Sequence, residues 1–181
     1  VPAWYIKTSE IKPKLIECAN SVKWEPASNG KRMNDWLTNM GDWNISRKRY
    51  YGMPLPFYPC DCGHITVIGS KDELREKAVD PAQVDALPEL HRPWVDEVKI
   101  KCPLCGKEVS RVPDIGDVWL DAGIVPFSTL GYFTDREAWE KNFPAEWVTE
   151  MHEQVRLWFY SMLFMSTVLV GKAPYEKVVT N

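Results

Sequence analysis

Apolar residues recur every three or four positions in three stretches of the chain, a spacing that predicts amphipathic helices. The first stretch runs from about residue 9 to 20 and the second from 31 to 40. The third, 145–170, is the longest and becomes almost entirely apolar towards its end. Gly41 and Gly171 follow the second and third stretches, and glycine is the residue that most often ends a helix. We therefore expect three amphipathic helices, and a further short helix is expected at 135–141.

Short apolar runs predict strands at 3–7, 115–120 and 175–180. The last two flank the long predicted helix, and strand, helix, strand is the βαβ unit of a parallel sheet. Ligands of such sheets bind beyond the carboxyl ends of the strands. The loop 117–123 and the first turn of the long helix should therefore lie side by side at a binding site. The predicted fold class is α/β, with the rest of the sheet supplied by chain outside this sequence.

Residues 57–113 differ in composition from the segments on either side and form a predicted insert. Two short helices are expected within it, at 72–77 and 81–87. The predicted organisation is thus a first segment, 1–56, then the insert, then a second segment, 114–181.

Four of the five cysteines stand in two close pairs, Cys60 with Cys62 and Cys102 with Cys105, and each pair is followed by a glycine. Two such pairs about forty residues apart are typical of a tetrahedral zinc site with four thiolate ligands. Four thiolates leave no coordination position for water or substrate, so the predicted zinc is structural. His64 is an alternative ligand, because the first pair is more tightly spaced than usual. Paired disulfides are the other interpretation of these cysteines.

The net charge of the chain bears on whether it binds nucleic acid. The chain of 181 residues has 22 basic and 25 acidic side chains and a net charge of −3, so no overall attraction to nucleic acid is expected. A local exception is the run Arg47, Lys48 and Arg49, which has aromatic residues on both sides. This run is either a solvated face or a patch that contacts phosphate groups.

No membrane segment is predicted. The apolar run 157–170 is too short to span a bilayer and is expected to be a buried helix. The chain starts at Val1, without a methionine or a signal sequence, and this favours a piece cut from a longer polypeptide.

Two segments carry candidate binding residues. On a continuous long helix, Glu150, Gln154 and Trp158 recur every four residues and share one face. Together they could hold an ammonium group, a polar edge and an aliphatic side chain of a ligand. The alternative is a solvated face of an amphipathic helix. Trp119 stands between two carboxylates at the predicted strand end, where the alternative is a strand core with acids at the surface.

Three segments resemble the large class I aminoacyl-tRNA synthetases for aliphatic amino acids, and they follow that family's order. DWNISRKRYYGMPLPFYPC (42–60) resembles the family's W-x-x-SRQRYWG-x-P-x-P segment, and DVWLDAG (117–123) resembles its DVWFDSG segment. TEMHEQVRLWFYS (149–161) is similar to the S-E-G-x-DQ-x-RGWFYS helix of the isoleucyl branch. The cysteine pairs fall where the family carries an inserted zinc module.

The resemblance implies a fold and a reaction. The fold would be the second half of a Rossmann-type parallel sheet with a small zinc-binding insert. The parent enzyme would activate isoleucine with ATP and Mg²⁺ and transfer it to its tRNA, by positioning and electrostatics rather than by a covalent nucleophile. No catalytic residue is therefore nominated.

The resemblance also implies roles for individual residues. Glu150, Glu153 and Gln154 would face the aminoacyl-adenylate, and Trp119 and Trp158 would wall the pocket for the aliphatic side chain. Such a pocket discriminates weakly between two aliphatic side chains: one methylene group changes the binding free energy by only about 1–3 kcal/mol. This weak discrimination explains why the family has a separate editing domain. The basic run 47–49 is the expected tRNA contact.

Some positions depart from the family pattern. Tyr51 replaces a tryptophan, and Met151 and Leu157 stand where glycines are usual. Without those glycines the backbone cannot approach an adenylate in the same way. The segment 126–131 is instead reminiscent of valyl enzymes, so a valyl- or leucyl-type enzyme is an alternative.

The family's HIGH-type and KMSKS-type motifs are absent from the sequence. We therefore expect the isolated chain to be inactive and to need the missing halves of the same polypeptide, with the editing domain before residue 1. The parent is expected to be a cytoplasmic monomer. The alternative from a different class is a stand-alone zinc-ribbon module that binds RNA or protein.

Overall fold

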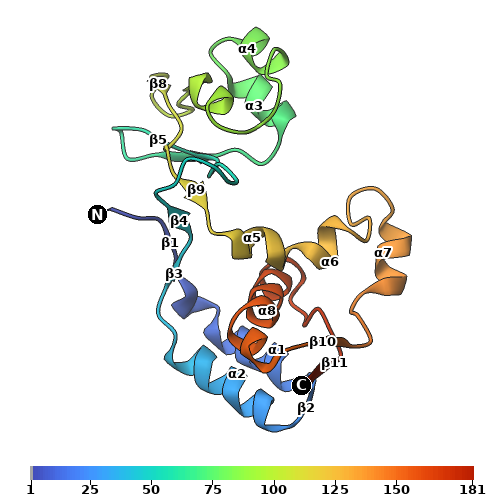
Figure 1. Ribbon diagram of the computed structural model, residues 1–181. Coiled ribbons are helices and arrows are strands. Elements are labelled where there is room, and N and C mark those ends of the chain that lie inside the picture. The colour runs from blue at the N-terminus through green and yellow to red at the C-terminus, as the bar shows by residue number, and fades with distance from the viewer. Residues whose placement is uncertain (1) are drawn as a thin grey trace. The chain divides into compact units, whose positions relative to one another are not determined.

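The computed structural model describes residues 2–181, which divide into two compact units. The first, here the cysteine unit, comprises residues 2–4 and 45–117. The second, the sheet unit, comprises residues 5–44 and 118–181 (Figure 1). Each unit has a hydrophobic core of its own. The two are therefore described one after the other.

The sheet unit is built on a parallel sheet of three strands, β10 (Val148–Glu150), β11 (Lys177–Thr180) and β2 (Lys23–Glu25). The central strand is β11, which pairs in parallel with β10 on one side and with β2 on the other. This confirms the predicted α/β class and its parallel sheet. A separate antiparallel pair joins β1 (Tyr5–Ile6) to β3 (Trp43–Asn44).

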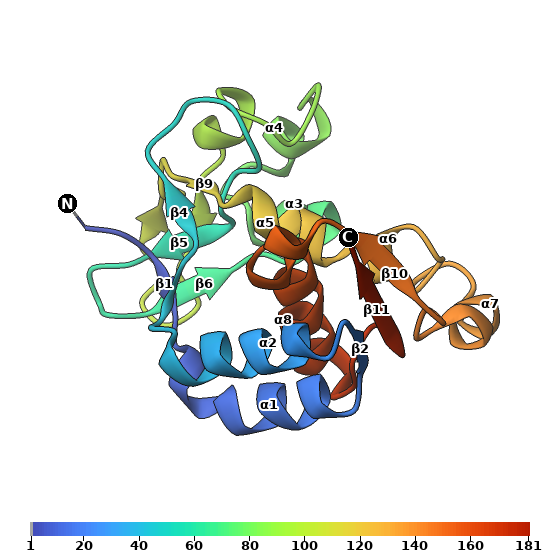
Figure 2. The ribbon, with the colours of Figure 1, turned by 60° about the horizontal axis from the view of Figure 1, so that its bottom comes forward.

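The helices of the sheet unit are η1 (Thr8–Glu10), α1 (Lys12–Asn20), α2 (Ser28–Asn39), α5 (Val118–Gly123), α6 (Val125–Ser128), α7 (Arg136–Asn142), η3 (His152–Arg156) and α8 (Trp158–Val170). Figure 2 shows α1 and α2 side by side, next to the long helix α8. Their apolar sides meet in the core around Leu15, Met33 and Leu163. The amphipathic pattern predicted from the sequence therefore faces inwards on these three helices.

The longest predicted helix, 145–170, is wrong in its first half. Instead of helix, the chain forms β10, then the short helix η3, and only then α8. Val148 and Thr149 are β-branched and pair with β11, so sheet pairing overrides the helical spacing. At Leu157 the backbone leaves the helical region (φ −119°, ψ −104°), which separates η3 from α8. The predicted end is confirmed, since Gly171 takes the left-handed conformation (φ 70°) after α8.

The predicted strand 115–120 is also wrong over most of its length. Only β9 (Ile115–Gly116) is a strand, and it pairs antiparallel with β4 (Ser46–Arg47) in the cysteine unit. The chain becomes helical in α5, at Val118. The βαβ unit is real but consists of β10, α8 and β11. Strand β2, which the sequence analysis did not anticipate, extends the same sheet.

The cysteine unit combines β4 and β9 with β5 (Phe57–Pro59), β6 (Ile65–Val67), α3 (Lys71–Lys77), α4 (Pro81–Asp85), η2 (Trp94–Glu97), β7 (Ile100–Lys101) and β8 (Glu108–Val109). The two short helices agree with the prediction for this part of the chain. Its core surrounds Tyr58, Val84 and Ile100, all fully buried. Burial raises the pKa of the Tyr58 phenol to about 12, so this group stays neutral inside the core.

Candidate functional site

The four cysteines predicted as metal ligands lie together in the cysteine unit. The four Sγ atoms, those of Cys60, Cys62, Cys102 and Cys105, all lie within 4.8 Å of one another. The Sγ–Sγ distance is 3.4 Å between Cys60 and Cys105 and 3.7 Å between Cys62 and Cys102. Tetrahedral ligands about 2.3 Å from a zinc ion are roughly 3.8 Å apart, so the cluster fits such an ion. The predicted alternative ligand, His64, instead contributes its backbone oxygen, which accepts from the Cys60 N–H (2.8 Å).

Two glycine turns shape the cluster. Gly63 and Gly106 follow the two cysteine pairs and have positive φ angles of 88° and 73°. In each turn the glycine N–H donates to the carbonyl of the first cysteine, at 2.9 Å for both Cys60 and Cys102. Only a residue without a Cβ adopts these angles at little cost, so the turns depend on glycine.

The backbone around Cys102 favours its thiolate form. Burial raises the pKa of the Cys102 thiol, but the backbone N–H groups of Cys105 and Leu104, with the neighbouring thiols, outweigh burial and lower it to about 7. Metal ions bind thiolates rather than thiols. Without a metal ion, hydrogen bonds among the thiols raise the pKa of Cys62 and of Cys105, so a bound cation would have to displace those protons. The donor set and the spacing fit a closed metal site with four sulfur ligands and no open position for substrate.

Buried carboxylates hold two of the three cations in the basic run. Arg47 pairs with Asp117 at 2.7 Å and Lys48 pairs with Asp114 at 2.7 Å. The two aspartates are 4% and 3% exposed. These ion pairs connect the segment around β4 to β9, so Arg47 and Lys48 stabilise the cysteine unit. Of the three, Arg49 has no carboxylate partner among residues 2–181.

A second charged network surrounds Arg111, whose side chain is almost fully buried. Its guanidinium donates to the carbonyls of Leu55 (3.0 Å) and Asp114 (2.9 Å) and also binds the Asp96 carboxylate. Burial raises the pKa of Asp96, but Arg111 and Arg92 outweigh burial and hold it below its ordinary value. The network fastens η2 to the chain beside β9.

The sheet unit brings α5 and the start of α8 into direct contact. Trp158, the first residue of α8, donates its Nε1–H to the carbonyl of Ala122 in α5 at 3.0 Å. Gly123 packs so closely on α8 that a Cβ there would lie 2.7 Å from the Ser161 carbonyl oxygen. The sequence analysis predicted that the loop 117–123 lies beside the first turn of the long helix. The contact is confirmed for residues 118–123, although this segment is a helix and not a loop. Trp119, in α5, is half-buried.

The polar candidates do not share a helix face, contrary to the prediction. Glu150 is the exposed last residue of β10, and its carboxylate accepts from the N–H of Met151 (3.2 Å). Gln154 lies in η3 and its Oε1 accepts from the Trp158 N–H (3.1 Å), which caps α8. Glu153 lies 3.4 Å from the imidazole of His152. These side chains follow one another past the carboxyl end of β10, where ligands of parallel sheets bind.

A pocket of about 350 Å³ lies at the same edge of the sheet, past the carboxyl ends of β2 and β11. Its lining includes Asn29, Arg32, His152 and Thr180. The Asn29 amide donates to the Thr180 hydroxyl at 2.6 Å and links the start of α2 to the end of β11. Sequence reasoning missed these residues because β2 was not recognised. The buried tryptophan between two charged residues in β2 was the only local signal.

The family model of the class I tRNA synthetases (I, L, M and V) matches residues 1–181. An isoleucine–tRNA ligase of Methanopyrus kandleri is 42% identical over 98% of this chain and 18% of the relative. The corresponding ligase of Methanosarcina barkeri is 43% identical over 98% of this chain and 16% of the relative. The ligase of Clostridium novyi is 41% identical over 98% of this chain and 17% of the relative. The chain thus spans less than a fifth of the length of these relatives.

A solved structure shares the fold. It is a LeuRS of Agrobacterium radiobacter K84 in a ternary complex with tRNA and LeuAMS, with a TM-score of 0.52 and 23% identity over 78% of this chain and 19% of that one. Among residues 2–181, no helix has the length and apolar character required to cross a membrane. Since the family model matches from end to end, the chain belongs to the class I tRNA synthetases for isoleucine, leucine, methionine and valine.

Proposed function

We propose that this chain is part of an isoleucine–tRNA ligase, in which the sheet unit binds isoleucyl-adenylate and the cysteine unit holds a structural zinc ion. The observation that carries the proposal is the arrangement past the carboxyl end of β10. There Glu150 ends the strand, and the Gln154 side chain accepts a hydrogen bond from the Trp158 backbone N–H. The Trp158 indole N–H in turn donates to the Ala122 carbonyl of α5. The identity of about two fifths to isoleucine–tRNA ligases supports isoleucine as the amino acid.

Each candidate has a chemical role in that site. The exposed Glu150 carboxylate accepts from the positively charged amino group of the amino acid, an interaction strengthened by charge. Gln154 uses its Oε1 to cap α8, so its amide nitrogen is the part that faces the ligand. Trp119 and Trp158 supply the apolar surface for the aliphatic side chain. Glu153 stands beside Gln154 on the adenylate side.

The proposed reaction uses no covalent protein nucleophile. The whole enzyme activates isoleucine with ATP and Mg²⁺, and the carboxylate of the amino acid attacks the α-phosphate while pyrophosphate leaves. A terminal hydroxyl of the tRNA then attacks the carbonyl carbon of the adenylate, so that the aminoacyl group passes to the tRNA and AMP leaves. In this scheme the residues of the chain contribute by orienting the reacting groups and by matching their charge.

The zinc ion has a mechanical role in this proposal. Four thiolates occupy all its positions, so it joins the β5–β6 turn to the β7–β8 turn and takes no part in the reaction. Metal binding of this kind contributes directly to folding.

Amino-acid-dependent ATP–pyrophosphate exchange tests the proposal, measured on the whole enzyme that carries this chain with isoleucine, valine and leucine. We expect exchange with isoleucine to exceed that with valine or leucine. Glu150→Gln should lower kcat/KM for isoleucine about tenfold or more, because a charge-assisted bond is lost. Glu146→Gln is the matched control, since Glu146 is also exposed but precedes β10 at its amino end.

A preference for valine or leucine in this assay would contradict the assignment of isoleucine. Equal effects of the two substitutions would contradict the role of Glu150. The 181-residue chain on its own should show no exchange above background.

A further inference from the structure

An exposed aromatic surface lies beside the basic run in the cysteine unit. Tyr50 and Tyr51 are 60% and 79% exposed, although the segment that carries them is held at several points. Lys48 is anchored by Asp114, as described above. Large aromatic side chains are costly to leave in water, so two adjacent ones in a fixed segment suggest a binding surface.

The residues 91–92 hold this segment in place. The Arg92 guanidinium donates to the carbonyl of Arg49 (3.3 Å), pairs with Asp96 (2.7 Å) and lies over the Tyr50 ring, 5.1 Å from its centre. Tyr50 is thus covered on one face by a cation. The backbone that carries Tyr51 is fixed before any ligand arrives, which lowers the entropic cost of binding.

The rings of Tyr51 and His91 are parallel and stacked with a sideways offset. Their planes differ by 3° and their centres are 5.9 Å apart. Because stacked carbon atoms are about 3.5–4.0 Å apart, parallel rings at this distance are displaced sideways. Each ring therefore overlaps the other only in part, and a third planar group can stack on the exposed face of Tyr51.

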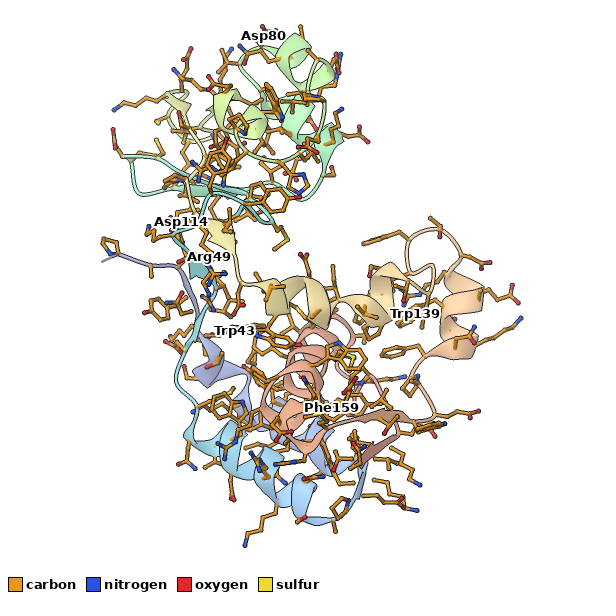
Figure 3. The ribbon with its side chains drawn as sticks, in the orientation of Figure 1. Trp43, Arg49, Asp80, Asp114, Trp139 and Phe159 are labelled. Carbon is orange, nitrogen blue, oxygen red and sulfur yellow. The ribbon has the colours of Figure 1, made fainter. Side chains whose placement is uncertain are left out.

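The cation that precedes the two tyrosines in the sequence, Arg49, suits a phosphate group. Arg49, labelled in Figure 3, is exposed and directly precedes Tyr50 and Tyr51. It lacks a carboxylate partner within residues 2–181. By contrast, Arg47 and Lys48 are neutralised by Asp117 and Asp114. A guanidinium without a carboxylate partner, two residues from an exposed aromatic ring, is a combination by which proteins bind single-stranded nucleic acid.

We propose that Arg49, Tyr51 and His91 form a stacking platform for an unpaired nucleotide of RNA. A base stacks on Tyr51, and Arg49 contacts the adjoining phosphate. The proposal rests on the proposed function and deepens it, because it moves the tRNA contact from the whole run 47–49 to one cation and one stacked pair of rings. A protein partner is less favoured, because flat exposed rings match the planar face of a base better than an aliphatic side chain.

Fluorescence anisotropy with a fluorescein-labelled single-stranded RNA hexamer tests the platform on the zinc-loaded chain. Tyr51→Ala should weaken binding about fivefold or more, the usual effect of losing one base–aromatic stack. Tyr51→Phe keeps the ring and should bind within about twofold of the unaltered chain. Arg49→Ala should weaken binding and reduce its dependence on salt concentration. Phe133→Ala is the control, since Phe133 is 94% exposed but lies in the sheet unit.

An abasic hexamer of the same length separates stacking from charge, and it should bind the unaltered chain no better than the natural hexamer binds Tyr51→Ala. Equal binding of the two hexamers, an unchanged affinity in Tyr51→Ala, or no binding of the unaltered chain would overturn the proposal. Isoleucine-dependent ATP–pyrophosphate exchange requires no RNA. Failure of the platform therefore leaves that exchange in the whole enzyme, whereas failure of the proposed function removes it.

Discussion

At the scale of single residues, Gly123 is where α5 comes closest to α8. A Cβ at this position would lie 2.7 Å from the Ser161 carbonyl oxygen and 2.8 Å from Cγ of Met165. The absence of a side chain therefore permits the contact that also lets Trp158 reach the Ala122 carbonyl. Gly41 provides a contrast, because a Cβ there would meet no atom within 4 Å.

Gly123→Ala should destabilise the chain by about 1–3 kcal/mol, since overpacking forces the two helices apart. Denaturant unfolding of the variant measures this change in the free energy of unfolding. Gly41→Ala is the control and should leave stability within about 0.5 kcal/mol. If both variants unfold at the same denaturant concentration as the unaltered chain, the close packing of α5 on α8 is contradicted.

At the scale of elements, the start of α8 depends on a side chain from the preceding segment. The first turn of a helix has backbone N–H groups without partners inside the helix. Here Gln154 supplies an acceptor to the N–H of Trp158, and no residue of the usual capping type stands at Leu157. The same cap orients Trp158, so the stability of α8 and the position of a residue in the proposed substrate pocket are connected.

Gln154→Ala should lower the free energy of unfolding by about 1 kcal/mol, the usual cost of losing a cap. Gln154→Glu keeps an acceptor and places a negative charge at the helix N-terminus, so it should retain most of the stability. Gln83→Ala, on an exposed position in the cysteine unit, controls for loss of a glutamine side chain. Thermal unfolding followed by circular dichroism makes the comparison. Equal losses in the Ala and Glu variants would argue against capping.

At the scale of the whole molecule, each unit has its own hydrophobic core, so the two units should respond differently to removal of a metal ion. The four cysteines belong to the cysteine unit, and the sheet unit has a core made of other residues. Because metal binding supplies folding free energy only where the ligands are, the two units should differ after chelation. The sheet unit should keep its helices.

Hydrogen exchange of the chain before and after chelation tests this expectation. Amide protection should fall around β5–β8 and remain in α1, α2 and α8. Acidification should act in the same direction, because protons compete with the metal for the thiolates. Metal content measured on the same samples, below half an equivalent per folded chain before chelation, would refute the four-cysteine site. A uniform loss of protection would show that the units do not fold independently.

Local patterns in the sequence were sufficient for part of the fold. The spacing of apolar residues predicted α1, α2 and the second half of the long helix, and Gly171 ends that helix as expected. The same spacing failed at 148–150, because Val148 and Thr149 are β-branched and pair with β11, a strand about thirty residues away that the spacing does not reveal. The two-residue strand β9 and the three-residue β2 are too short for any periodicity to be read.

For the candidate site too, local sequence patterns predicted some features, and only the tertiary structure decided others. The sequence alone predicted that the four cysteines form one cluster, because ligand spacing is a local property, and it indicated the family, because three ordered motifs occur in one chain. Only the tertiary structure decided that Val148 belongs to a strand paired with Val178, and that Arg47 is paired with Asp117, 70 residues away. Such partners meet because folding brings distant segments together, and their pairing energy outweighs the preference of each segment taken alone.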